Sequence, residues 1–116
     1  MVDPSFIPQL VPLFAPYCGG VNRERELTAA LVRLVTGELR GTRALADGGG
    51  HDYGLRWSGT PAPLEPLQCR LSFPDLPAID YSFEIPCHQL VRWLIEAPGQ
   101  GLPESFWPWL LQGHGA

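Results

Sequence analysis

Cys87 and His88, adjacent in the chain, are the residues best placed to do covalent chemistry. Cys87 follows a proline and starts a run with helical spacing, and the positive end of a helix dipole lowers the pKa of a thiol. Neighbouring helical side chains point about 100° apart, so His88 faces away from the thiol and His51 is the alternative base. The pattern predicts either a small thiol-dependent enzyme centred on Cys87 or, as we favour, a buried cysteine that closes the core.

Metal and cofactor sites have little support in the sequence. Cys18, Cys69 and Cys87 are odd in number and far apart, unlike the close pairs of zinc knuckles and redox sites. The triple glycine at 48–50 lacks the other residues of a phosphate-binding loop. We therefore expect reduced thiols, no metal and no cofactor.

Asp80 and Glu84 are the second chemical candidate, as two carboxylates on one face of a strand. A strand rises about 3.3 Å per residue, which puts them about 13 Å apart, beyond the usual spacing of a glycosidase pair. Arg70 is expected between them on the neighbouring strand. An ion pair on a solvated face is therefore the prediction.

Two apolar ends that contain prolines are the candidates for binding a partner. Residues 102–116 crowd large side chains into a segment too short to turn all of them to one side. Residues 1–20 carry prolines every four positions, and their apolar side chains either cover the core or meet a partner. The residues predicted to bind are Phe106, Trp107, Trp109, Leu110, Phe6, Leu10 and Phe14. For the C-terminal segment the alternative is a lid packed over the sheet.

Hydrophobic periodicity predicts the elements that position these residues. Apolar residues with helical spacing predict helices at 23–39 and 87–97, and the alternating stretch 51–58 predicts a strand that residues 44–47 could pair with. The prolines limit residues 1–20 to a kinked or one-turn helix that stops at Gly19 and Gly20, and 102–112 to a short helix.

The clearest prediction is a hairpin with its turn centred on Leu76. Its register pairs Phe73 with Ile79, Leu71 with Tyr81, Cys69 with Phe83 and Leu67 with Ile85, all on one apolar face. Ser72, Arg70 and Gln68 then face Asp80, Ser82 and Glu84 on the polar side. The predicted fold is a two-layer α+β domain spanning 1–116. It has a small antiparallel sheet of two to four strands, packed by one helix from each half of the chain.

The charge balance narrows the function. The chain has 12 acidic and 8 basic residues, a net charge of -4, and every base is an arginine scattered among acids. Nucleic acids and anionic membranes are therefore poor partners, and no apolar run is long enough to span a bilayer. We expect a cytoplasmic, non-catalytic interaction module that binds another protein or a second copy of itself, such as an adaptor, assembly factor, inhibitor or immunity-type binder.

Overall fold

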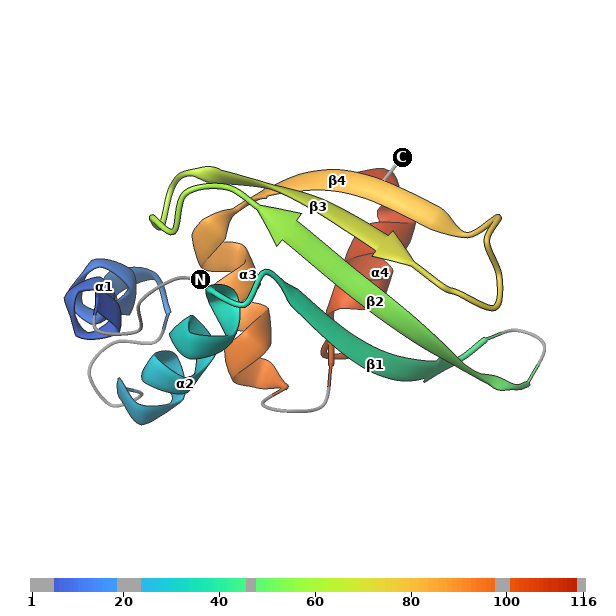
Figure 1. Cartoon of the computed structure of the whole chain (residues 1–116), viewed down its shortest axis with the longest axis horizontal. Helices are drawn as coiled ribbons and strands as arrows, with labels where there is room; N and C mark the ends of the chain where they lie inside the picture. The colour runs from blue at the N-terminus through green and yellow to red at the C-terminus, as the bar shows by residue number, and fades with distance from the viewer. Residues whose placement is uncertain (1–5, 19–23, 46–47, 98–100, 115–116) are drawn as a thin grey trace.

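The computed structural model describes residues 6–18, 24–45, 48–97 and 101–114. It confirms the α+β class, because helices from both halves of the chain accompany one antiparallel sheet with strand order β1-β2-β3-β4 (Figure 1). In chain order the elements are α1 (Ile7–Phe14), a 3-10 turn (Ala15–Tyr17), α2 (Glu24–Leu34), β1 (Glu38–Ala44), β2 (Gly50–Ser58), β3 (Pro66–Ser72), β4 (Asp80–Pro86), α3 (Cys87–Glu96), α4 (Phe106–Trp109) and a π-helical turn (Leu110–His114). No described helix is long and apolar enough to cross a membrane.

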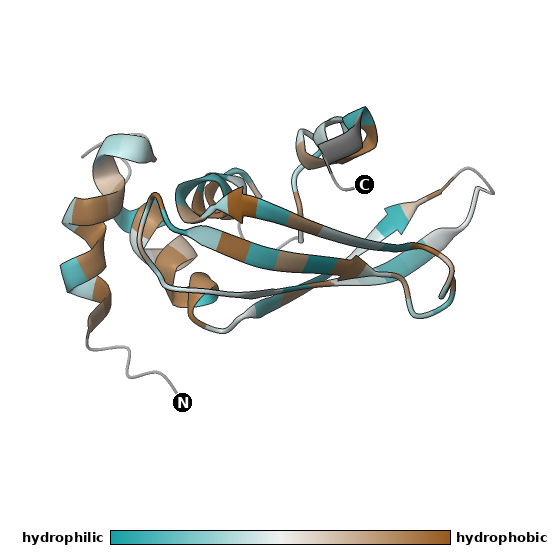
Figure 2. Ribbon diagram, turned by 90° about the horizontal axis from the view of Figure 1, so that it is seen from above, coloured by the Kyte–Doolittle hydropathy of each residue, from teal (hydrophilic) through white to brown (hydrophobic). Residues whose placement is uncertain are grey.

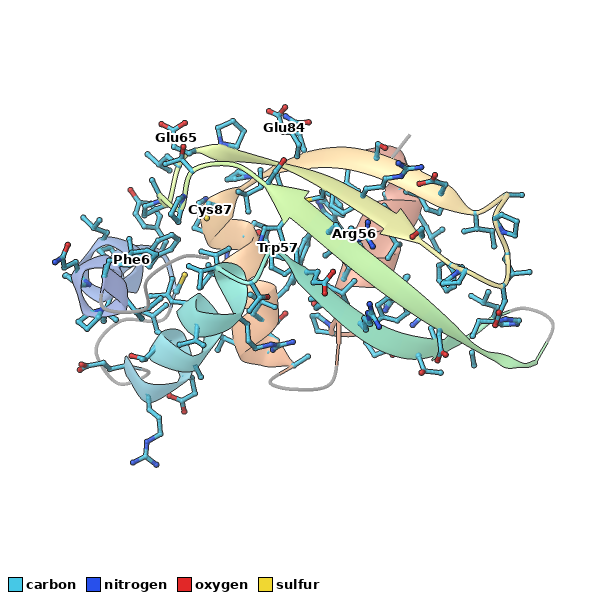
Figure 3. The ribbon with its side chains drawn as sticks, viewed as in Figure 1. Phe6, Arg56, Trp57, Glu65, Glu84 and Cys87 are labelled. Carbon is cyan, nitrogen blue, oxygen red and sulfur yellow. The ribbon has the colours of Figure 1, made fainter. Side chains whose placement is uncertain are left out.

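The sheet has one apolar and one polar face. In β2 the buried residues are Tyr53, Leu55 and Trp57, which alternate with more exposed positions. Helices α3 and α4 lie on the apolar side, and the opposite side carries polar residues such as Arg56 (Figures 2 and 3). Helix α2 packs against α3 and α1 packs against α2, so α1 lies at one end of the molecule (Figures 1 and 2).

The hairpin of β3 and β4 has the predicted register. Leu67 pairs with Ile85, Cys69 with Phe83 and Leu71 with Tyr81. Phe73 and Ile79, predicted as a fourth pair, lie just beyond the two strands and pack against the same core. The strict alternation of apolar and polar residues is sufficient to set this register, because a slip by one residue would expose the apolar face.

The helix predicted at 23–39 is wrong at its C-terminal end. Helix α2 ends at Leu34, and Gly37 then adopts a left-handed φ of 81° that reverses the chain into β1. The buried Trp57 indole N–H donates to the Leu34 carbonyl at 2.8 Å, and the Trp57 backbone N–H donates to Gly37 at 2.9 Å. These bonds let Leu39 pair with Leu55 in the sheet instead of extending the helix.

The strand predicted at 44–47 is placed too late. Strand β1 ends at Ala44, which pairs with Gly50, and positions 46–47 lie outside the described residues. In the N-terminal segment, where a kinked or one-turn helix was expected, α1 is a two-turn helix that continues through Pro12. The predicted stop at Gly19 and Gly20 lies outside the described residues.

Candidate functional site

The thiol of Cys87 is at the N-terminus of α3 (Figure 3) and is buried in the core, as the favoured of the two interpretations predicted. Burial raises the pKa of Cys87 to about 12, and a backbone hydrogen bond with Ala62 opposes this shift only in part. Burial likewise raises the pKa of Cys18 to about 11 and that of Cys69 to about 12. The expected lowering of the Cys87 pKa is therefore wrong, because loss of solvation outweighs the helix dipole.

The two histidines do not complete a catalytic site around Cys87. His51 pairs with Arg43 near the β1–β2 turn, whereas Cys87 follows the opposite end of the sheet, roughly 30 Å away by strand rise. The ring of His88 stacks on Tyr17, with 5.2 Å between ring centroids. Burial, and then the charge of Arg92, lower the pKa of His88. Among the described residues no three His, Cys, Asp or Glu side chains cluster as a metal site.

His88 instead helps to attach the N-terminal segment to α3. Its backbone carbonyl accepts a hydrogen bond from the Cys18 thiol at 3.8 Å, and its ring stacks on Tyr17. Both contacts lie at the end of the segment that begins with α1. We call these two contacts the clasp, because they hold Tyr17 and Cys18 at the end of the N-terminal segment against α3.

The polar face of the hairpin forms the ion pair that the sequence predicted. The Arg70 guanidinium donates to both carboxylate oxygens of Asp80, and the shortest N–O distance is 2.6 Å. This hydrogen bond lowers the pKa of Asp80 and raises that of Arg70. Glu84 projects from the sheet and accepts a hydrogen bond from Gln68 (Figure 3). The two carboxylates thus have separate partners and do not act as a catalytic pair.

The C-terminal aromatic segment is mostly a lid on the sheet. Phe106, Trp107 and Leu110 are buried. Phe106 meets Trp93 edge-on at 5.0 Å between centroids, and Trp107 meets Tyr53 at 5.1 Å. Trp107 also lies 4.4 Å below the guanidinium of Arg43, and Leu102 donates its backbone N–H to the Tyr53 hydroxyl at 2.8 Å.

Partner binding by this segment stays a prediction, with fewer side chains to carry it. The buried Phe106, Trp107 and Leu110 cannot reach a partner in this conformation. Trp109 is half-buried against Phe83 and Trp93, and Leu111 is 73% exposed. Among the side chains described in α4 and the turn after it, a partner would meet Pro108, Leu111, Gln112 and part of Trp109.

The N-terminal helix has a free face that sequence reasoning missed. Leu10 and Phe14 are buried and Phe6 is partly buried, so the three residues predicted to bind a partner there face the core. The opposite side, which we call the α1 face, consists of exposed Pro8, Gln9, Pro12, Leu13 and Pro16. The available signal was the proline spacing of four, which places three prolines on one side of a helix.

A groove separates the α1 face from α2. It has a volume of about 430 Å³ and is lined by Pro8, Val11, Pro12, Ala15, Glu24, Leu27 and Thr28. The lining is apolar except for the carboxylate and the hydroxyl at its α2 rim. We call it the α1–α2 groove.

Comparison with known families covers nearly the whole chain. Residues 4–114 match the protein family described as "Type IV pilus, essential for biofilm suppression A-like". No curated protein matches the sequence. The matched range includes every described helix and strand, among them α1 and the groove beside it.

Proposed function

We propose that this chain, which belongs to the type IV pilus biofilm-suppression family, works as a non-catalytic protein-binding component of the pilus system. The family match relates the chain to type IV pili and biofilm suppression. The buried, high-pKa thiols give no support to the alternative of a thiol-dependent enzyme. A cytoplasmic location stays a prediction from the sequence.

The α1 face is the observation that carries this proposal. The α1 face has no charged side chain and a single polar one, Gln9, and its Leu13 is 54% exposed. Burying apolar surface is worth about 25 cal/mol per Å², so a contiguous exposed apolar face gains free energy when a partner covers it. The adjoining groove would add further apolar area to that contact.

Substitution of Leu13 tests the proposal in cells. Leu13→Asp places a charge on the α1 face without removing a core side chain. In cells that lack the native gene, we expect this variant to give the same defects in surface pili and biofilm suppression as the empty vector. The matched control is Leu64→Asp, because Leu64 is 68% exposed on the loop between β2 and β3 and does not belong to the α1 face or line the groove.

Thermal unfolding of both purified variants decides how the result is read. We expect both to unfold within a few degrees of the wild type, since exposed substitutions change stability by about 0.5 kcal/mol or less. The proposal fails if the folded Leu13→Asp variant supports pili and biofilm suppression as well as Leu64→Asp does.

A further inference from the structure

We propose that the α1–α2 groove receives an apolar helix of the partner, with one Lys or Arg side chain of that helix against Glu24. This inference rests on the proposed function and adds the chemistry of the partner. The apolar residues that line the groove between the two helices are Pro8, Val11, Pro12, Ala15 and Leu27. A helix that enters would therefore complete a three-helix arrangement on a surface that is already apolar.

The backbone of the groove favours a helix over an extended segment. Pro12 and Pro16 have no N–H, so the carbonyls of Pro8 and Pro12, one turn earlier, lack their α-helical donors. Both walls of the groove are helices, so they present no ladder of alternating donors and acceptors of the kind a strand edge has. An extended chain would leave many of its own polar groups unpaired, whereas a helix satisfies them internally.

The charge of the groove selects a basic side chain. Glu24 is the only charged residue among those that line it, and it forms no ion pair with any described residue. The neighbouring Thr28 hydroxyl already donates to the Glu24 carbonyl at 2.8 Å. A Lys or Arg from the partner could pair with the Glu24 carboxylate.

Two other occupants fit less well. A second copy would bring its own α1 face, which has no base, and a second Glu24, so like charges would meet. An anionic membrane would meet Glu24 and Glu26 in the first turn of α2, in a chain with a net charge of -4 and no lysine.

Two fluorescent helical peptides test the inference on the full chain. Both have about 16 residues, rich in Ala and Leu, long enough to form a helix. One carries a single Arg on its apolar face and the other carries Gln at that position. By fluorescence anisotropy we expect the Arg peptide to bind about fivefold more tightly, the ratio for an ion pair of about 1 kcal/mol.

Matched variants assign that preference to the groove. The Glu24→Gln variant should bind both peptides equally. The Glu26→Gln variant, changed two residues later on the same helix and outside the groove lining, should keep the preference for the Arg peptide. Thr28→Lys provides a second variant that does not weaken the fold, because a Lys four residues after Glu24 stabilises the helix. The ammonium group of this lysine should pair with the Glu24 carboxylate in place of the peptide, and the preference for the Arg peptide should again be lost.

The inference is overturned if neither peptide binds, if both bind the wild type equally, or if the preference survives in Glu24→Gln. Sedimentation with vesicles of equal phosphatidylglycerol and phosphatidylcholine tests the membrane alternative. If the wild type binds these vesicles and Leu13→Asp does not, the proposal of a helical partner is wrong and the α1 face binds a lipid surface. If the peptide experiment fails but Leu13→Asp is clearly defective in cells, only the proposed chemistry of the groove is wrong and the proposed function is kept. A harmless Leu13→Asp removes the proposed function itself.

Discussion

The two ends of the chain have similar compositions but are buried to different extents. Helix α1 and the segment from α4 onward are both apolar, and both contain a proline within a helix. The C-terminal segment lies against the sheet and α3, where Phe106 meets Phe83 and Trp93. Helix α1 packs on α2 at one end of the molecule (Figure 2), and within the described part of the chain its proline-bearing side stays exposed.

The difference shows that apolar content alone does not identify a binding surface. Side chains that diverge around a short helix can all be buried when the helix has neighbours on several sides. The aromatic rings of Tyr53, Phe83 and Trp93 provide those neighbours for α4. A helix with one neighbour keeps a free face, and in α1 this face is the side that carries the prolines.

The largest expected effect separates the two ends by stability. Phe106→Ala removes a ring that is fully buried, and we expect it to lower the free energy of unfolding by about 3 to 5 kcal/mol. Leu13→Ala, on the exposed α1 face, should change it by about 0.5 kcal/mol or less. Urea unfolding of the two variants measures both values. A mild effect of Phe106→Ala would mean that the C-terminal segment is not part of the core.

A second, smaller effect tests how the C-terminal segment reaches the sheet. Gly101 has a left-handed φ of 85°, and an added Cβ would lie 2.5 Å from the Tyr53 hydroxyl. We expect Gly101→Ala to cost about 1 to 2 kcal/mol in backbone strain and about 2 kcal/mol more in steric overlap. Gly48 is the matched control, because its φ is 82° and nothing lies within 4 Å of an added Cβ. Equal losses of unfolding free energy in the two variants would contradict the close approach.

The smallest expected effect is a pH dependence confined to the N-terminal end. Burial and Arg92 lower the pKa of His88, so the unfolded chain takes up this proton at a higher pH than the folded chain does. Stability is complete above the ordinary histidine pKa of about 6.5 and falls as the pH decreases from there toward the lower folded value. Hydrogen exchange from about pH 7.5 to about pH 5.5 should show protection lost in α1 before α4.

His88→Gln removes the titrating group and serves as the control for this pH dependence. We expect its α1 protection to change much less over the same pH range. An unchanged slope in His88→Gln would assign the effect to other groups and leave the clasp between Tyr17, Cys18 and α3 insensitive to pH.

Local pattern was enough for the hairpin and for α3. The alternation in β3 and β4 specifies which residues face the core, and a register follows once the turn is centred on Leu76. Pro86 marks the start of α3, which ends at Glu96, one residue before the predicted end. Helix α2 was predicted too long because Val35 and Glu38 continue its spacing, while the bonds of Trp57 that end it come from a distant strand.

The candidate site was predicted less well than the fold, for the same reason. Leu10 and Phe14 are apolar, so the sequence indicates that something covers them. It does not say whether the cover is the rest of the domain or a partner, and in the structure both are buried within the domain. The exposed side of α1, and Glu24, which forms no ion pair with any residue that the structure describes, become visible only when α1 and α2 are packed together. For Cys87, the sequence indicated a helix dipole, and only the packing around the thiol revealed the desolvation that raises its pKa.

By itself, the sequence determined the α+β class, the paired strands of the hairpin and the polar ion pair of Arg70 with Asp80. These follow from residues close in the chain, because side-chain alternation and turn residues act over a few positions. The tertiary structure decided which apolar end became a lid and which kept a free face. That choice depends on how many neighbours each segment meets, and desolvation of a side chain is set by contacts between residues far apart in the sequence.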